Sequence, residues 1–267
     1  MRFDHDYHIH SKLSECSSDP AETAERILEY AKNCGLYKIC ITDHFWDEAV
    51  PGASDWYKAQ NLAHINQIKP LPSAVGIEFL FGCETDIDKY MTLGMSLPCF
   101  DNFDFVIIPT THLHMTGFTI TPEDKADNAK IAQLWVERFE KLLDMPLPFH
   151  KIGIAHLACA LMNNRSREDY LDTLNRISDE DMKRVFTKAA RVGCGIEINR
   201  FDVDVSDEEC DCVLRMFRIA KACGCKFYFG SDAHHPTELE SSAPVFERIS
   251  AILGLTEEDI FKIGDKK

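Results

Sequence analysis

The first residues that could do chemistry lie almost at the amino terminus, in the run Asp6-Tyr7-His8-Ile9-His10-Ser11. If residues 3–10 form a strand, side chains alternate across it, so His8 and His10 point to one side and Ile9 to the other. Two imidazoles about 6–7 Å apart on one face of a strand can bind one metal ion. Histidines are also common as hydrogen-bonded core residues or as surface residues, so this pair needs support from the rest of the chain.

The same pattern, an apolar run that ends in a polar residue, recurs along the chain. Short apolar runs alternate with amphipathic stretches, which is typical of βα units around a parallel sheet. We expect seven strands, at residues 3–10, 37–42, 77–83, 103–109, 151–155, 195–198 and 226–230. Each ends in side chains that can bind a metal or hydrogen-bond a ligand: His8 and His10, His44, Glu84, His112, His156, Asn199, and Asp232 with His234.

Six helices are expected between and after the strands, at about 19–33, 54–67, 121–143, 179–192, 206–222 and 244–253. Asp19 would cap the first helix with Pro20 at its first position, and Thr121 would cap the third. The length of 267 residues suits an α/β barrel that forms one domain over residues 1–267. No repeat or linker divides the chain.

In a parallel barrel the carboxyl ends of all strands meet at one face, so these polar residues would converge there. Each has a simpler interpretation by itself: His44 could cap a turn, and Glu84 could be a solvated loop acid. His156 fits such an interpretation less well, because a histidine within an apolar run needs a buried partner. Seven coincidences at seven strand ends are improbable, and a convergent metal site is favoured.

The expected ligand set combines five or six imidazoles with two or more carboxylates and needs no thiolate. This mixture suits zinc, manganese or iron better than calcium, which prefers oxygen ligands alone. There are too many ligands for one four-coordinate ion. We therefore expect two to three divalent ions with a bridging carboxylate. Such clusters bind phosphoryl oxygens and supply a metal-bound hydroxide near neutral pH.

The composition limits partners and location. A formal net charge of −15 disfavours a nucleic-acid-binding surface. The chain has no apolar run long enough for a membrane span and no apolar signal core at its start, so we expect a cytoplasmic protein. The eleven cysteines are expected to be reduced and mostly buried. Cys210/Cys212 and Cys223/Cys225 resemble a zinc knot, but the first pair falls in an expected helix, where residues two apart face different directions.

These strand-end motifs together resemble the polymerase-and-histidinol-phosphatase (PHP) superfamily of metal-dependent phosphoesterases. The resemblance extends from His8 to His234 and keeps the family's order. It rests on His8-Ile9-His10-Ser11, Thr42-Asp43-His44, Gly82-Cys83-Glu84, Thr111-His112, Ala155-His156 and Gly230-Ser231-Asp232-Ala233-His234. It implies a distorted seven-stranded (β/α) TIM-like barrel that holds up to three metal ions.

The resemblance also implies how the ligands are shared. His8, His10, Glu84 and Asp232 would hold a first ion, and Glu84 would bridge to a second held by His112 and His156. A third would bind His44, His234 and a residue of the loop after the first motif, where Glu15 stands in place of the Asp that relatives often carry. Asp232, His234 and His44 are the candidate catalytic residues. The candidate substrate-binding residues are Arg200, as a phosphate clamp, and His114 and His235, as outer-layer or leaving-group residues.

The leading hypothesis is a histidinol-phosphatase-like phosphomonoesterase for a small organic phosphate, in which metal-bound hydroxide attacks phosphorus and a histidine protonates the leaving group. A related nucleotide phosphoesterase or phosphodiesterase and a non-catalytic metal-binding domain remain alternatives. A metal-dependent amidohydrolase is disfavoured, because no strand end supplies the bridging lysine. The sequence leaves the substrate and the oligomeric state open. Phe45, Trp46, Trp56 and Phe118 could form an apolar wall for the leaving group, or could pack the loops down.

Overall fold

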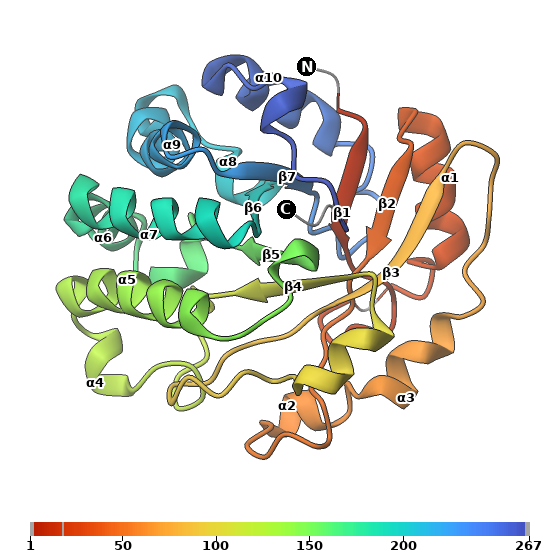
Figure 1. Cartoon of the computed structure of the whole chain (residues 1–267), viewed down its shortest axis with the longest axis horizontal. Coiled ribbons are helices and arrows are strands. Elements are labelled where there is room, and N and C mark those ends of the chain that lie inside the picture. Colours follow the sequence, from red (N-terminus) through yellow and green to blue (C-terminus); the bar gives the residue numbers. More distant parts are fainter. Residues whose placement is uncertain (1–2, 18, 265–267) are drawn as a thin grey trace.

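Seven parallel strands wrap into a nearly closed barrel, with helices around its outside (Figure 1). The computed structural model describes residues 3–17 and 19–264. The strands pair in chain order: β1 (His5–Ile9), β2 (Lys38–Ile41), β3 (Glu78–Glu84), β4 (Phe105–Pro109), β5 (Ile152–Ala155), β6 (Gly195–Asn199) and β7 (Lys226–Gly230). The seven strands and the TIM-like α/β barrel expected from the sequence are confirmed.

Hydrogen bonds just beyond the strand ends bring β7 back to β1. The Asp232 amide donates to the His8 carbonyl (2.7 Å), and the His10 amide donates to the Ala233 carbonyl (3.1 Å). The register of β1 against β2 shifts between Asp6 and Ile9. Such bulges bend a strand and redirect its side chains, and here the bend lies in the first His-x-His segment.

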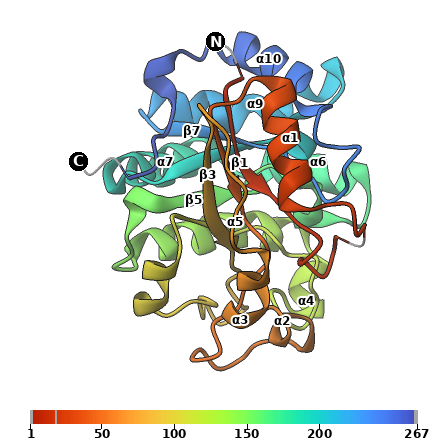
Figure 2. The same ribbon diagram turned by 90° about the vertical axis from the view of Figure 1, so that its right-hand side faces the viewer.

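Helices cover the outer face of the barrel. Those of ten residues or more are α1 (Ala24–Cys34), α5 (Asn128–Asp144), α6 (Arg167–Arg176), α7 (Asp179–Val192), α9 (Asp207–Ala222) and α10 (Ser242–Leu253). The short ones are α2 (Asp55–Lys58), α3 (Leu62–Ile65), η1 (Asn66–Ile68), η2 (Leu97–Asn102), α4 (Pro122–Lys125), η3 (Phe149–Lys151), η4 (Ala160–Asn163), α8 (Arg200–Val203) and η5 (Glu257–Asp259). Figure 2 shows α2 and α3 at the opposite end of the molecule from α10. No described helix is long and apolar enough to cross a bilayer.

Two expected helices begin or break elsewhere because of capping side chains. The first helix starts at Ala24 rather than near Pro20, since Thr23 accepts a hydrogen bond from the Arg26 amide, while Asp19 caps a preceding turn. The helix expected over 121–143 is two helices. Asp127 accepts hydrogen bonds from the amides of Ala129 and Lys130 and so starts α5 afresh.

Two further segments differ from expectation. The helix expected over 54–67 consists of single turns, because Ser54 caps α2 and Asn61 caps α3 a few residues later. Helix α6 was not expected. Its sequence, REDYLDTLNR, is rich in charged residues, and only three of its residues, Tyr170, Thr173 and Leu174, are buried. Helix α7, in contrast, has the bounds expected from its apolar spacing.

The barrel interior is filled below the strand ends by side chains that alternate with those facing the helices. Tyr7, Phe105, Tyr228 and Phe261 form an interior aromatic cluster, with ring centroids of Phe105 and Tyr228 5.2 Å apart. Phe261 reaches this cluster because its amide donates to the Phe227 carbonyl at 2.7 Å. The cluster closes the amino-terminal side of the barrel, so the open end is the one that carries the polar residues.

Candidate functional site

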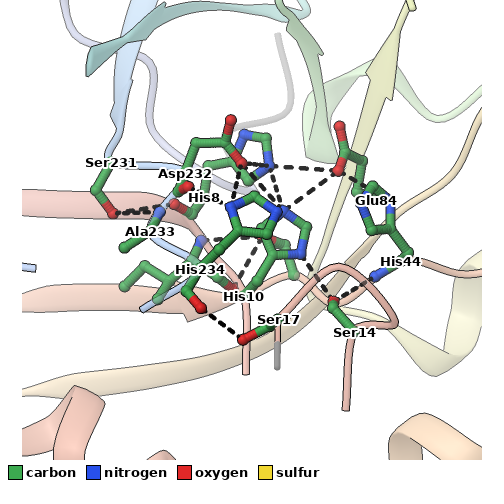
Figure 3. A network of polar contacts seen from close by, with 12 residues as sticks. His8, His10, Ser14, Ser17, His44, Glu84, Ser231, Asp232, Ala233 and His234 are labelled. Carbon is green, nitrogen blue, oxygen red and sulfur yellow. Dashed lines mark hydrogen bonds and ion pairs between the residues drawn. The ribbon is translucent and has the colours of Figure 1, made fainter. Parts of the chain in front are cut away.

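The polar residues that end the strands gather at the carboxyl face of the barrel (Figure 3). Glu84 is the last residue of β3, and His156 directly follows β5. His44 lies beyond β2 and is held beside Glu84 by a parallel bridge. Glu84, His156 and His44 are each more than nine-tenths buried, although they are spread over more than a hundred positions of the chain.

One oxygen of Glu84 faces three imidazoles. Its Oε2 lies 3.5 Å from His8 Nε2, 3.4 Å from His10 Nε2 and 3.2 Å from His44 Nδ1. His8 Nε2 and His10 Nε2 are themselves 3.1 Å apart, so the first two histidines share one side of the chain as the spacing predicted. Both rings are fully buried.

The other oxygen of Glu84 faces a second pair of imidazoles. Its Oε1 lies 3.5 Å from His156 Nε2 and 3.9 Å from His112 Nε2. The Glu84 carboxylate therefore lies between two sets of nitrogen atoms. A carboxylate can ligate a different metal ion with each oxygen, whereas a neutral imidazole offers one lone pair.

Asp232 has a similar position on the opposite side of the barrel. Its Oδ1 lies 3.3 Å from His8 Nε2 and 3.1 Å from His10 Nε2, and its Oδ2 lies 3.5 Å from His156 Nε2. His156 and Asp232 both have positive φ angles, 59° and 54°. Left-handed backbone is costly for residues other than glycine, and such strain is concentrated at functional sites.

Several buried atoms at this site have no hydrogen-bond partner in the described structure: both oxygens of Glu84, Oδ1 of Asp232, and Nδ1 of His44 and His156. Burial alone would raise the pKa of Glu84, but the charges of His44 and His8 hold its pKa well below its ordinary value. A buried anionic carboxylate that accepts no hydrogen bond needs positive charge beside it. The donor set of imidazoles and carboxylates fits divalent metal ions.

Outer carboxylates orient two of the histidines through their other ring nitrogen. His8 Nδ1 lies 2.6 Å from Glu197 Oε1, and His112 Nδ1 lies 3.0 Å from Asp86 Oδ2. The second oxygen of Glu197 accepts a hydrogen bond from the His156 amide at 3.1 Å. Carboxylates in this position fix the tautomer and orientation of metal-binding histidines. Sequence reasoning missed both carboxylates.

A buried group on the far side of His156 was also missed. His156 Nδ1 lies 3.7 Å from Asp202 Oδ1, and Cys159 belongs to the same close group of possible ligand atoms. Burial raises the pKa of Asp202, although its hydrogen bond and charge interaction with His156 lower it. Asp202 lies in α8, which directly follows Asn199 at the end of β6. This position just beyond a strand end was the only feature of the sequence that pointed to Asp202.

The loop after β1 brings Cys16, not Glu15, to the site. Cys16, His10, His44 and His234 each offer one ligand atom, and these atoms all lie within 4.8 Å of one another. Glu15 is exposed and belongs to none of the possible metal-binding groups among the described residues. The structure therefore does not bring Glu15 together with His44 and His234.

The three candidate substrate-binding residues have different surroundings. His114 lines a cavity next to the metal-binding residues, and burial together with the neighbouring His112 lowers its pKa to about 4. Arg200 is not among the residues that line this cavity, and its guanidinium lies over the Phe201 ring, 4.6 Å from the ring centroid. His235 is exposed and pairs with Asp19 at 2.8 Å. Only His114 is brought to the site.

A cavity of about 710 Å³ opens onto the metal-binding residues. Its polar lining includes His44, Glu84, His112, His156, Asp232 and His234, and its apolar walls include Trp56, Tyr57, Met115, Phe118, Leu161 and Phe201. None of the described residues that line it is Lys or Arg. Of the aromatic residues expected at a wall, Trp56 and Phe118 line the cavity, whereas Phe45 and Trp46 are buried in the packing.

The cysteine pairs of the possible zinc knot do not form one of the close ligand groups found among the described residues. Cys212 Sγ lies 3.9 Å from the Leu171 carbonyl, and Cys223 Sγ lies 3.7 Å from the Lys183 carbonyl. None of the eleven cysteines, which all lie within the described residues, forms a disulfide.

Comparison with solved structures finds the same fold in two bacterial proteins. A histidinol phosphate phosphatase from Lactococcus lactis, solved with zinc, L-histidinol and phosphate, superimposes with a TM-score of 0.62 and 18% identity over 93% of this chain and 94% of that one. A Listeria monocytogenes chain assigned as a histidinol phosphatase gives a TM-score of 0.55 and 13% identity over 88% and 97%.

The sequence was also compared with curated proteins and with family models, and the two comparisons differ. No curated protein matches the chain. The family model of the PHP domain, however, matches residues 6–201, which include every candidate ligand except Asp232 and His234 at the end of β7. Since that match covers well over half of the sequence, the chain belongs to the PHP domain family.

Proposed function

We propose that this protein is a metal-dependent phosphomonoesterase for a small organic phosphate. The observation that carries the proposal is the pair of buried carboxylates, Glu84 and Asp232, whose oxygens lie between two sets of imidazoles. Membership of the PHP family and the fold shared with a zinc-containing histidinol phosphate phosphatase support the same function.

Two to three divalent ions, of zinc, manganese or iron, would be held by residues already close together. His8, His10 and Asp232 form one group, His8, Glu84 and His156 a second, and the residues near His44 and His234 a third. When bound, such ions neutralise phosphoryl oxygens and make coordinated water acidic enough to react near neutral pH. Glu84 and Asp232 would keep the ions together, because each presents its two oxygens to different imidazoles.

Other residues of the cavity would bind the ester. Trp56, Phe118 and Leu161 provide an apolar surface that excludes water from the organic part of the substrate. His44, His234 and Asp232 line the cavity and so can contact both the ions and the phosphate. His114 has a buried Nδ1 without a partner among the described residues. Since its pKa is near 4, His114 would hydrogen-bond to the ester as a neutral imidazole rather than deliver a proton.

The apolar walls favour a monoester with an uncharged or aromatic organic group over a nucleotide. A nucleotide would place further phosphates or a polar sugar against Trp56, Met115 and Phe118. Histidinol phosphate fits the proposed class, because its organic part is small and carries an imidazole ring that can stack on aromatic side chains. Nucleotide phosphoesterase activity is the alternative that a substrate screen distinguishes.

The test is hydrolysis of an aryl phosphate, histidinol phosphate and a set of nucleotides by protein of known metal content. We expect activity that is lost with a chelator and restored by zinc, manganese or iron. Asp232→Asn should lower kcat by orders of magnitude, because it removes a buried charge between the imidazoles, whereas Asp211→Asn on the exposed face of α9 is the matched control. Full activity in metal-free protein would exclude the proposed function, and full activity of Asp232→Asn would remove Asp232 from the proposed site.

A further inference from the structure

We propose that Cys16 is a metal ligand in this protein, and that its thiolate binds one ion together with His44 and His234, next to His10. One potential ligand atom from each of these four residues lies within 4.8 Å of the other three. The inference rests on the metal-binding part of the proposed function and adds a soft ligand to a site that otherwise contains nitrogen and oxygen.

The turn that carries Cys16 is fixed on both sides of the cysteine. The Glu15 amide donates to Gln60 Oε1 at 3.0 Å, and the Ser17 hydroxyl donates to the His234 carbonyl at 2.8 Å. The Ser17 amide also donates to the Ser14 carbonyl at 2.9 Å, which closes the turn. Cys16 is thus held at the cavity, which it lines, while the Glu15 side chain faces solvent.

Ser14 connects this turn to the imidazoles. Its hydroxyl lies 2.9 Å from His10 Nδ1, donates to Asp43 Oδ1 at 2.8 Å and accepts the His44 amide at 3.1 Å. One side chain therefore sets the positions of the cysteine turn and two of the histidines together. The rings of His10 and His234 are stacked, with centroids 4.1 Å apart, and Figure 3 shows both next to His44 and Ser14.

A second observation points to a ligand at this position. His44 is 7% exposed, and its Nδ1 is buried without a hydrogen-bond partner among the described residues. The same nitrogen lies 3.2 Å from Glu84 Oε2, and a neutral imidazole has one lone pair that it can offer to a metal ion. A bound cation would satisfy this nitrogen and the cysteine sulfur at the same time.

The chemistry of a thiolate ligand differs from that of the Glu expected at this position. On binding, the thiol releases its proton to solvent and the sulfur donates an electron pair to the metal. Thiolates favour zinc and cobalt over manganese, which prefers oxygen ligands. We therefore infer that the ion next to Cys16 is zinc-like, even if the ions at Glu84 and Asp232 accept a wider range of metals.

Cobalt(II) provides a direct test, because thiolate coordination gives a charge-transfer absorption in the near ultraviolet that imidazole and carboxylate ligands do not give. The full-length protein is loaded with cobalt, and the band and the metal content are measured for wild type, Cys16→Ser, Cys16→His, Cys159→Ser and Glu15→Gln. We expect the band in wild type, Cys159→Ser and Glu15→Gln. Cys16→Ser should lose the band and bind one fewer ion, and Cys16→His should lose the band but keep the ion, because imidazole replaces the sulfur.

Each alternative outcome has a distinct meaning. A band that persists in Cys16→Ser and disappears in Cys159→Ser would assign the thiolate to the buried group at His156 and overturn the proposal. Cobalt binding without a band would overturn it while leaving the proposed function intact, and failure of wild type to bind any cobalt would overturn both. Loss of metal in Glu15→Gln would show that Glu15, and not Cys16, is the metal ligand from this loop.

Thiol labelling gives a second measurement that does not depend on variants. Cys16 is the exposed cysteine of the described chain, and Cys34 at the end of α1 is half-buried. We expect zinc to slow alkylation of Cys16 at least tenfold while the rate at Cys34 stays the same, as followed by mass spectrometry of the labelled peptides. Equal rates at Cys16 with and without zinc would contradict a metal–sulfur bond.

Discussion

The carboxylate of Glu84 presents its oxygens to different imidazoles, and no described donor hydrogen-bonds to either oxygen. Two divalent ions about 3.5–4 Å apart repel each other strongly, and an anionic bridge makes that separation tolerable. A neutral amide in the same place could not compensate this repulsion. The function of Glu84 therefore depends on its charge and not only on its shape.

We predict that Glu84→Gln loses the two ions on either side of it together. The ion near His44 and His234 should be affected less. Metal content and affinity, measured under identical loading conditions, test this, and Glu78→Gln in the exposed part of the same strand is the matched control. A Glu84 variant that retains the metal content and affinity of wild type would show that this carboxylate is not the bridge.

A second buried carboxylate lies away from the candidate ligands. Glu22 is fully buried, and neither of its oxygens has a hydrogen-bond partner in the described structure. Burial raises its pKa to about 8, although Arg26 lowers it. The unfolded chain releases this proton near pH 4.3. The folded protein thus binds more protons between these values, so ionisation of Glu22 costs stability progressively from about pH 4 to about pH 8.

Glu22→Gln stays neutral at every pH and should remove this cost. We predict that the variant is more stable than wild type at pH 9, and that the difference shrinks toward zero near pH 4. Urea unfolding at a series of pH values measures the difference, with Glu25→Gln on the exposed side of α1 as control. A constant difference across the pH range would mean that Glu22 does not titrate in this window.

At the level of the elements, sequence patterns predicted the parts of the site that lie on strands. His8, Glu84 and His156 follow or end apolar runs, and the parallel topology must bring such positions to one face. Capping residues predicted where a helix begins when they precede an amphipathic stretch, as Thr121 does. They did not predict the helices that Asn61 and Asp127 begin inside such a stretch.

Features that depend on tertiary contacts could not be predicted in this way. Glu197 lies within an expected strand and orients His8, 189 positions away, so nothing local distinguishes it from a solvated acid. Glu15 and Cys16 are neighbours in a loop without a repeating geometry, and only the turn around Ser14 decides which of them faces the cavity. Loops lack the periodicity on which sequence-based placement depends.

Strand β7 supplies an element-scale test, because its last residue allows Glu197 and His8 to approach. A Cβ at Gly230 would collide with Glu197 Oε1 and lie 2.6 Å from the Cβ of His8. We predict that Gly230→Ala weakens zinc binding roughly 10–100-fold, as expected when an outer carboxylate no longer supports its histidine. Zinc affinity by competition with a chelating dye is the measurement.

Gly195→Ala in β6 is the control for a general packing defect. Its Cβ would lie 2.9 Å from Phe261 Cγ and 2.9 Å from Tyr228 Cδ1, in the interior aromatic cluster. This change should lower the free energy of unfolding by about 1–3 kcal/mol, as overpacked cores do, with unchanged zinc affinity of the folded protein. If the two variants lose zinc affinity equally, Gly230 acts through stability alone.

For the whole molecule, charge and cavity act on the substrate at different distances. The chain carries a formal charge of −15, and three divalent ions would reduce this only to about −9. A phosphate ester therefore approaches a surface of the same sign, although divalent ions bound at the barrel mouth would attract it at short range. Close to the site, the apolar walls act on the organic part, which the long-range field does not affect.

This balance predicts the direction of the salt dependence. The Debye length falls from about 30 Å at 0.01 M to about 8 Å at 0.15 M salt, so added salt screens the repulsion between the protein and an approaching anion. We expect kcat/KM for a dianionic aryl phosphate to rise about two- to five-fold over this range, with kcat nearly unchanged, because screening acts on encounter rather than on the bound ester. Initial rates at fixed pH and metal concentration measure both constants. A substrate of higher charge should show a steeper rise. A fall in kcat/KM with salt would mean that local positive potential at the barrel mouth, and not the net charge, governs the approach of substrate.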